Sequence, residues 1–257
     1  MTQGFASKLQ SRIASLPAKP HPVSLDTSSC AVVVIDMQND FGTEGGMFHR
    51  AGIDITLIQA VIEPTARVLR AARNAGLPVI YLKMQHRPDL SDAGTFDSPH
   101  RRKHAHFGLG DMVQGAAGQE GRILVQDTWS TDIVSGLTPE QGDIIVSKHR
   151  YSGFFQTDLE MILRSLGATA LVVTGCTTSV CVEATIRDAM YRDFTCLLLE
   201  DCTAEPIGSV LARSNHEASL LTIQLLLGWT ATSAAFITAL GLQEASVVAQ
   251  PLEDLTR

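Results

Sequence analysis

The sequence lacks the features that mark membrane, secreted and disordered proteins. None of its apolar runs reaches the roughly eighteen residues that a membrane-spanning helix needs, and the longest candidate, residues 220–227, is interrupted by Thr222 and Gln224. The first residues, MTQGFASKLQSRIASLPAKPHP, contain basic side chains but no apolar core of the kind that a secretory signal has. The composition, with 45% hydrophobic and 18% charged residues, indicates a folded globular protein.

The sequence also lacks paired cysteines and an excess of positive charge. Its five cysteines are odd in number and include no CxxC pair, which favours reduced thiols in a cytoplasmic protein. The formal net charge of −7 argues against nucleic acid and against an anionic membrane as partners. We therefore expect the partner to be a small molecule.

Short β-branched runs alternate with helical segments along the chain. The predicted strands cover residues 31–35, 79–84, 143–147, 170–174 and 194–199, and the predicted helices cover residues 55–75, 157–166, 178–191 and 209–227, with a final short strand and helix beyond them. This alternation predicts an α/β fold, doubly wound, with a mostly parallel six-stranded sheet and helices on both faces. We expect an N-terminal arm over residues 1–28, one domain over residues 29–245 and a C-terminal tail over residues 246–257.

One long segment, residues 85–122, is rich in Gly, His, Asp and Pro and has little periodicity. Segments of this kind are often lids or binding loops, and the alternatives are a subunit contact or a surface excursion with a short helix. Its basic cluster of Arg101, Arg102 and Lys103 can hold a substrate carboxylate. A solvated face or a subunit contact is the more common role of such a cluster.

Three reactive side chains follow predicted strands. Ligands of open parallel sheets bind beyond the carboxyl ends of the strands, where Asp36 and Lys148 follow the first and third strands and Cys181 opens the helix after the fourth. A helix start and a nearby ammonium group favour the thiolate that acts as a nucleophile, and a carboxylate can move the proton. Each residue alone has a commonplace reading, as a buried small hydrophobe, a solvated cation or a turn former. Their convergence favours catalysis.

Three segments, IDMQNDF, KxxYSGFF and TGCTTSVCVEATIRDA, resemble the signature segments of the isochorismatase-like cysteine hydrolases, and the resemblance spans residues 30–203. Within this superfamily RYSGFFQTDLEMILRSLG is most similar to ureidoacrylate amidohydrolases, and HRPDLSD is similar to biuret hydrolases. The resemblance implies a Rossmann-like three-layer sandwich, a homo-oligomer (dimer or tetramer), no cofactor, and an Asp-Lys-Cys triad at Asp36, Lys148 and Cys181.

The resemblance also implies a mechanism. A cis peptide bond is expected between Cys176 and Thr177, with the N–H groups of Thr177 and Cys181 as the oxyanion hole. Asp36 then accepts the thiol proton, Lys148 holds the thiolate, and the attack gives a thioester or thiocarbamate that water hydrolyses. The substrate is a small linear ureide or amide, with ureidoacrylate first and biuret or an N-carbamoyl amino acid next.

Six further residues are predicted to bind this substrate. Amide side chains are candidates for hydrogen bonds to the ureide, and aromatic side chains are candidates for the walls of a small pocket. They are Gln38, Asn39 and Gln85 for the first role, and Phe41, Tyr151 and Phe155 for the second. Core packing is the alternative for Phe155.

No metal site is expected. Nicotinamidases place metal ligands in a D-x-H pattern after the second strand, and this chain has His86 alone there, in MQHRPDLSD. His100, His104 and His106 lie downstream, and we predict that they are solvated loop residues. Two alternatives to the cysteine hydrolase remain: a metal-assisted, nicotinamidase-like amidase, and a non-enzymatic thiol or ligand-binding protein in which Cys181 is a redox sensor.

Overall fold

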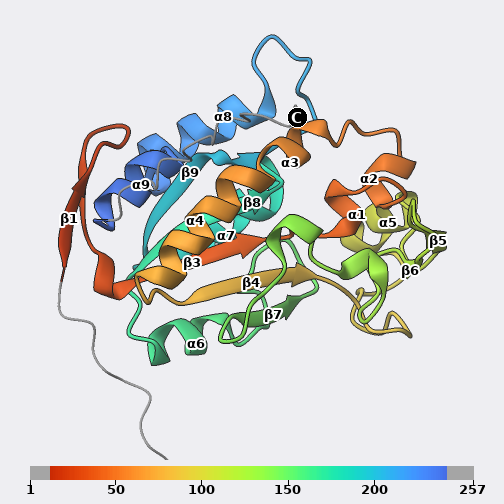
Figure 1. Cartoon of the computed structure of the whole chain (residues 1–257). Helices are drawn as coiled ribbons and strands as arrows, with labels where there is room; N and C mark the ends of the chain where they lie inside the picture. The colour runs from red at the N-terminus through yellow and green to blue at the C-terminus, as the bar shows by residue number, and fades with distance from the viewer. Residues whose placement is uncertain (1–11, 242–257) are drawn as a thin grey trace, which may run out of the picture.

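Six parallel strands form the centre of the computed structural model, which describes residues 12–241 (Figure 1). The strand order is β10-β9-β8-β3-β4-β7, which confirms the predicted sheet. The strands are β3 (Cys30–Ile35), β4 (Val79–Met84), β7 (Ile144–Lys148), β8 (Ala170–Cys176), β9 (Thr195–Ala204) and β10 (Trp229–Ala231). The central strands β3 and β8 are buried along their whole length because helices cover both faces of the sheet.

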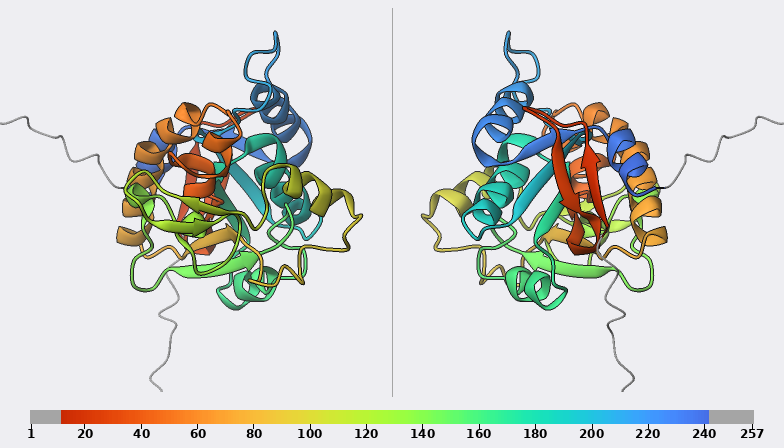
Figure 2. Two further views of the ribbon diagram at one scale, coloured as in Figure 1. Left: turned by 90° about the vertical axis from the view of Figure 1, so that its right-hand side faces the viewer. Right: turned by 90° about the vertical axis from the view of Figure 1, so that its left-hand side faces the viewer.

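The side chains of β3 alternate between two separate cores. Val32 and Val34 pack on one face with buried residues of α4 (Ile62–Asn74) and α9 (Ser233–Ala239). Val33 packs on the other face with buried residues of α6 (Leu159–Ser165) and α7 (Glu183–Met190), and α8 (Asn215–Thr222) lies on this side as well. Figure 2 shows the resulting layers, helix, sheet and helix, end on.

Three predicted helices are interrupted in the structure. The segment 55–75 divides into α3 (Thr56–Ala60) and α4, because Pro64 in the first turn of α4 has no N–H to donate to the Ala60 carbonyl. The nucleophile segment opens with a π-helical turn, η4 (Thr178–Val182), before α7. The last predicted helix begins only at α8, where Ser214 and Glu217 form a capping box, and it ends in the π-helical turn η5 (Ile223–Leu227).

The predicted N-terminal arm contains a hairpin. Strands β1 (Ile13–Leu16) and β2 (Val23–Asp26) pair antiparallel and are followed by the 3-10 turn η1 (Thr27–Ser29). The hairpin lies at the opposite end of the sheet from the carboxyl ends of the strands (Figures 1 and 2), and it packs through Leu16 against the core that α9 shares. The predicted tail, residues 246–257, lies outside the described residues.

The carboxyl ends of the strands are covered by short elements (Figure 1). These elements are α1 (Asn39–Gly42), α2 (Met47–Arg50), α5 (Pro99–His106), the hairpin of β5 (Met112–Gln114) with β6 (Glu120–Arg122), and the 3-10 turns η2 (Trp129–Thr131) and η3 (Ser135–Leu137). Residues 85–122, for which a short helix was one of the alternatives, contain the helix α5 and a hairpin. Within residues 12–241, no helix has the length and apolar character to cross a membrane.

Candidate active site

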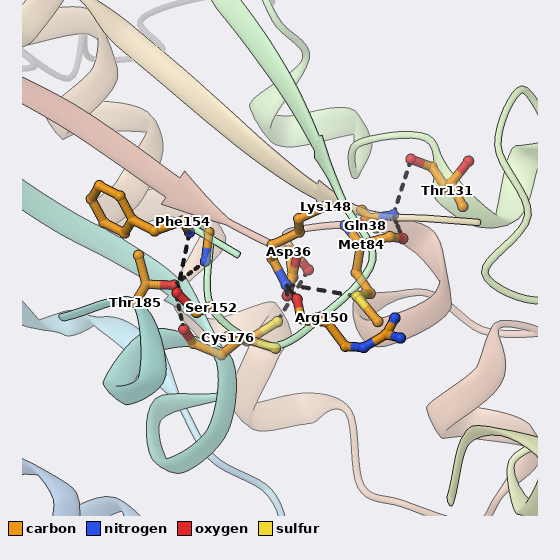
Figure 3. A network of polar contacts seen from close by, with 12 residues as sticks. Asp36, Gln38, Met84, Thr131, Lys148, Arg150, Ser152, Phe154, Cys176 and Thr185 are labelled. Atoms are coloured by element: carbon orange, nitrogen blue, oxygen red, sulfur yellow. Dashed lines mark hydrogen bonds and ion pairs between the residues drawn. The ribbon is translucent and has the colours of Figure 1, made fainter. Parts of the chain in front are cut away.

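Asp36 and Lys148 form a buried ion pair where β3 and β7 end (Figure 3). The Lys148 ammonium donates to Asp36 Oδ2 at 2.7 Å and to the Arg150 carbonyl at 3.2 Å. Asp36 turns out of the strand with a φ of 52° while its own N–H donates to the Leu82 carbonyl. Because both side chains are at most 1% exposed, each ion depends on the other for compensation of its lost hydration.

The turn after β8 approaches this pair closely. Gly175 has a φ of +115°, and a Cβ there would lie 2.1 Å from the Ile35 carbonyl oxygen, so only glycine fits. The Cys176 thiol donates to the Asp36 carbonyl at 3.2 Å, which ties the turn to the end of β3. The Cys176–Thr177 peptide bond is cis, as the resemblance implies.

Cys181 lies in the π-helical turn η4 and is 7% exposed. Its thiol interacts with both members of the ion pair, since it contributes to the pKa shifts of Asp36 and Lys148. The expectation of a favoured thiolate took account of the helix start and the ammonium group but not of burial. Burial and then the charge of Asp36 raise the pKa of Cys181 well above its ordinary value, and Lys148 offsets only part of this rise.

The pKa values of both members of the ion pair are raised, so Asp36 is a better proton acceptor and Lys148 stays a cation. Burial raises the pKa of Asp36, although Lys148 opposes the rise. For Lys148, burial lowers the pKa, but the negative charge of Asp36, the charge of Cys181 once it ionises, and hydrogen bonds to both leave it raised. Asp36 Oδ1 is buried and makes no hydrogen bond within the described part of the chain. This oxygen is therefore free to take a proton from Cys181.

Glu205, which sequence reasoning missed, anchors the nucleophile turn. It is 2% exposed just beyond the end of β9, and its carboxylate accepts hydrogen bonds from Ser179 N and Ile207 N, both at 3.0 Å. The sequence signal that could have identified Glu205 is its position directly after a strand, which is the same signal that identified Asp36 and Lys148.

The residues matched by a family model extend over most of the described chain. The model of the isochorismatase domain matches residues 30–235. The chain belongs to the isochorismatase family. A ureidoacrylate amidohydrolase RutB from Methylorubrum extorquens is 38% identical over 90% of both chains, and one from Rhizobium rhizogenes is 39% identical over 88% of this chain and 89% of the relative.

Solved structures of the isochorismatase family share the fold. A cysteine hydrolase from Pseudomonas syringae pv. phaseolicola has a TM-score of 0.71 and 28% identity, and covers 91% of this chain and 99% of its own. An N-carbamoylsarcosine amidase from Thermoplasma acidophilum has a TM-score of 0.59 and 26% identity, and covers 80% and 96% of the two chains. Family and relatives make this chain an amidohydrolase, a hydrolase of carbon–nitrogen bonds other than peptide bonds.

Three of the six predicted substrate-binding residues of this isochorismatase-family enzyme have structural roles. Gln38 is fully buried, and its amide donates to the carbonyls of Met84 and Thr131 and accepts from Met84 N. Asn39 donates to the Trp129 carbonyl and accepts from a threonine hydroxyl. Phe41 packs edge-on against another ring in the core, with centroids 5.0 Å apart. These side chains shape the strand edge and offer no free group to a substrate.

The other three predicted residues are less committed to packing and hydrogen bonds. Tyr151 is 36% exposed and Phe155 is 44% exposed. Tyr151 lies near the catalytic centre, because after burial the charges of Cys181 and Lys148 are what shift its pKa. Gln85 donates to the Ser147 hydroxyl, while its amide oxygen has no partner among residues 12–241.

The downstream histidines are not the solvated residues that we predicted. His104 is buried and His100 is half-buried, and both come from α5 to meet His86; His106 alone is exposed. No D-x-H pattern predicted this cluster, because its three rings come from two segments that only the fold brings together. In the basic cluster, Arg102 and Lys103 are exposed.

Proposed function

We propose that this amidohydrolase cleaves a carbon–nitrogen bond of a small linear ureide, ureidoacrylate first, with Cys181 as the nucleophile. The observation that supports this most strongly is the buried pair of Asp36 and Lys148, 2.7 Å apart, with the Cys181 thiol interacting with both. The relatives named as ureidoacrylate amidohydrolases, at 38% and 39% identity, support the substrate. Biuret and N-carbamoyl amino acids are the next candidates, and the likeness to an N-carbamoylsarcosine amidase supports the latter.

The first half of the reaction forms a covalent intermediate. Asp36 Oδ1 accepts the proton of the Cys181 thiol, and the Lys148 ammonium stabilises the thiolate. The thiolate attacks the carbonyl carbon of the ureide and forms a carbon–sulfur bond, and the carbonyl oxygen becomes an oxyanion. The N–H groups of Thr177 and Cys181 stabilise this charge. The carbon–nitrogen bond then breaks, and the leaving nitrogen takes the proton from Asp36.

The second half returns the enzyme to its resting state. Asp36, ionised again, takes a proton from water, whose oxygen attacks the thioester or thiocarbamate carbon. The carbon–sulfur bond breaks, and the Cys181 thiolate recovers the proton from Asp36. Burial favours the neutral thiol at this point, since it raises the pKa of Cys181. Residues of this chain supply every proton transfer in the cycle.

The proposed function is tested by ammonia release from a panel of substrates: ureidoacrylate, biuret, N-carbamoylsarcosine, nicotinamide and simple carboxamides. Each substrate is assayed with the wild type, Cys181→Ser and Cys202→Ser. Cys202 is a matched control because it is also a buried free thiol but lies outside the ion-pair site. We expect turnover of a ureide that Cys202→Ser retains and Cys181→Ser lowers by at least about 10³-fold.

The panel also separates the alternatives. Turnover that survives in Cys181→Ser contradicts the cysteine mechanism. No turnover of any ureide or amide, with a thiol that still reacts with alkylating agents, contradicts the hydrolase and favours the redox or ligand-binding protein.

A further inference from the structure

Three imidazole rings converge beside the catalytic centre. One ring nitrogen from each of His86, His100 and His104 lies within 4.8 Å of those of the other two. The ring centroids of His100 and His104 are 4.2 Å apart, and each is about equally far from His86, at 6.0 and 6.2 Å. The cluster is therefore a compact triangle of nitrogen atoms.

Each of the three rings has one buried nitrogen without a hydrogen-bond partner among residues 12–241. His86 Nε2, His100 Nε2 and His104 Nδ1 are buried and form no hydrogen bond with any residue from 12 to 241. His86 is fully buried and His104 is 93% buried, because its exposed fraction is 7%. Buried polar atoms are nearly always satisfied, so an orphaned nitrogen on each of three rings that meet within 4.8 Å indicates a missing ligand.

The fold holds the rings in place. His100 and His104 are one turn apart on α5, so their side chains leave the same face of the helix. The ring of His86 is fixed from its other side, because Nδ1 lies 3.1 Å from Asp92 Oδ1. A carboxylate that accepts from Nδ1 keeps the proton there and leaves the Nε2 lone pair facing the cluster, an arrangement typical of metal-bound histidines.

The charge state of the rings indicates whether the ligand is a cation or an anion. Burial, and then the charge of His104, lower the pKa of His100 to about 3. Burial, and then the charge of His86, lower the pKa of His104 to about 4, although the His100 carbonyl opposes this. The rings are therefore neutral near pH 7 and offer lone pairs. Neutral rings offer an anion such as a substrate carboxylate no positive charge, which favours a cation as the ligand.

We propose that His86, His100 and His104 form a binding site for a divalent transition-metal ion of the zinc type. Imidazole nitrogens suit zinc and its neighbours, and three protein ligands leave a position for a solvent or substrate oxygen. Tetrahedral Zn–N bonds of 2.0–2.1 Å place nitrogens about 3.4 Å apart. The three ligand atoms need to approach one another by at most about 1.4 Å, which small ring rotations provide.

The site borders the proposed catalytic centre without sharing its residues. The Tyr151 ring lies against His100 and His104, at centroid distances of 5.3 and 5.7 Å, and Tyr151 also senses the charges of Cys181 and Lys148. No carboxylate belongs to the ligand set, so it differs from the D-x-H pattern. Metal binding is measured without substrate, so its outcome is independent of the proposed hydrolase activity.

The test is a Co²⁺ titration of chelator-treated, full-length protein, followed by its visible absorption and repeated with Zn²⁺ as competitor. Cys181→Ser serves as the background, so that this thiol cannot bind the ion. We expect one equivalent of Co²⁺ per chain, displaced by Zn²⁺. His100→Ala and His104→Ala are expected to weaken binding by at least ~100-fold, and Asp92→Asn, which loosens the hold on the His86 ring and keeps all three ligands, by ~10–100-fold.

His106→Ala is the matched control, because this histidine is exposed on the same helix, and it is expected to bind Co²⁺ as tightly as the background does. Far-ultraviolet circular dichroism of each metal-free variant verifies the fold. Absence of saturable binding in the background protein overturns the proposal, and so does unchanged affinity in His100→Ala and His104→Ala. Should either alanine variant fail to fold, the milder Asp92→Asn decides, and unchanged affinity there overturns the proposal.

Discussion

At the scale of single residues, the candidate site combines a buried ion pair with a thiol that is held protonated. Lys148 is fully buried and Asp36 is 1% exposed, so neither charge is compensated by water. The pair places a cation next to Cys181 permanently, whereas the proton on the sulfur leaves only when Asp36 accepts it. The nucleophile therefore forms only when Asp36 accepts the proton. Because the resting enzyme holds a thiol and not a thiolate, side reactions of the sulfur are limited.

The raised pKa of Cys181 leads to a pH prediction. Since burial and Asp36 both favour the thiol, the thiolate fraction is small near pH 7 and grows as pH rises toward the raised pKa. Alkylation of Cys181 by iodoacetamide, followed by mass spectrometry of its peptide, should accelerate up to the highest pH at which the protein stays folded. A rate that levels off below about pH 7, as for thiols with a lowered pKa, would contradict it.

Asp36→Asn tests the same balance from the other side. It removes the negative charge and keeps Lys148, so the pKa of Cys181 falls and alkylation at about pH 8 becomes faster than in the wild type, while turnover is lost. Asn is nearly isosteric with Asp, which limits changes in packing.

The ion pair also makes a stability prediction. Asp36→Asn leaves the buried Lys148 ammonium without its counter-charge and should lower the free energy of unfolding by about 3–5 kcal/mol. In the double variant Asp36→Asn with Lys148→Met no charge is left unpaired, so part of this loss should return although activity does not. Urea denaturation of the double variant and of the single variants Asp36→Asn and Lys148→Met measures these losses of unfolding free energy. A double variant whose loss is the sum of the two single losses would show that the residues are not coupled.

Some residues of the candidate site could be predicted from the sequence and others could not. Asp36, Lys148 and Cys181 were predictable because each follows a strand, and strand ends of a parallel sheet meet at one edge. Gln38 was misjudged because a sequence does not reveal that its amide bonds are spent on the backbone of Met84 and Thr131. The histidine cluster was missed because His86 and α5 approach only through a segment with no periodic signal.

At the scale of elements, β3 and β8 must approach closely so that the nucleophile turn reaches Asp36. Their register pairs Ile35 with Gly175, and the missing side chain of Gly175 makes room for the Ile35 carbonyl. The sheet was predictable from its apolar runs. The π-helical turn η4 and the break before α4 were not, because periodicity marks a helix better than the geometry of its first turn.

Gly175→Ala tests this close approach. It adds a Cβ 2.1 Å from the Ile35 oxygen in a backbone conformation with φ of +115°, so it should destabilise the fold and abolish turnover. Gly142→Ala is the control, because Gly142 has a φ of +103° but nothing within 4 Å of the added Cβ. The control should cost only the ~1–2 kcal/mol of the strained backbone. Equal losses of thermal stability in the two variants would contradict a steric requirement at Gly175.

At the scale of the whole molecule, exposed leucines gather at the end of α8 and in η5. Leu221, Leu225 and Leu226 are 42%, 62% and 73% exposed, whereas Phe236 of α9 is fully buried in the core. Exposed apolar groups that lie together mark interaction surfaces. We propose that they form the subunit interface of the homo-oligomer that the family resemblance implies.

Light scattering during gel filtration tests this surface. We expect the wild type to be a dimer or tetramer, and Leu225→Glu with Leu226→Glu to shift it toward the monomer, because burying two carboxylates at an interface is costly. Met161→Glu is the control, since Met161 is 65% exposed on α6. A monomeric wild type, or an oligomer that the leucine variant leaves intact, would contradict an interface at this surface.

The most direct test of the proposed chemistry is mass spectrometry of the enzyme quenched during turnover of ureidoacrylate. The mechanism predicts an acyl or carbamoyl group on the sulfur of Cys181, which accumulates when hydrolysis of the intermediate is slower than its formation. The adduct should be absent from Cys181→Ser and from enzyme without substrate. Turnover that leaves Cys181 unmodified at every quench time, together with full activity in Cys181→Ser, would contradict a covalent cysteine mechanism.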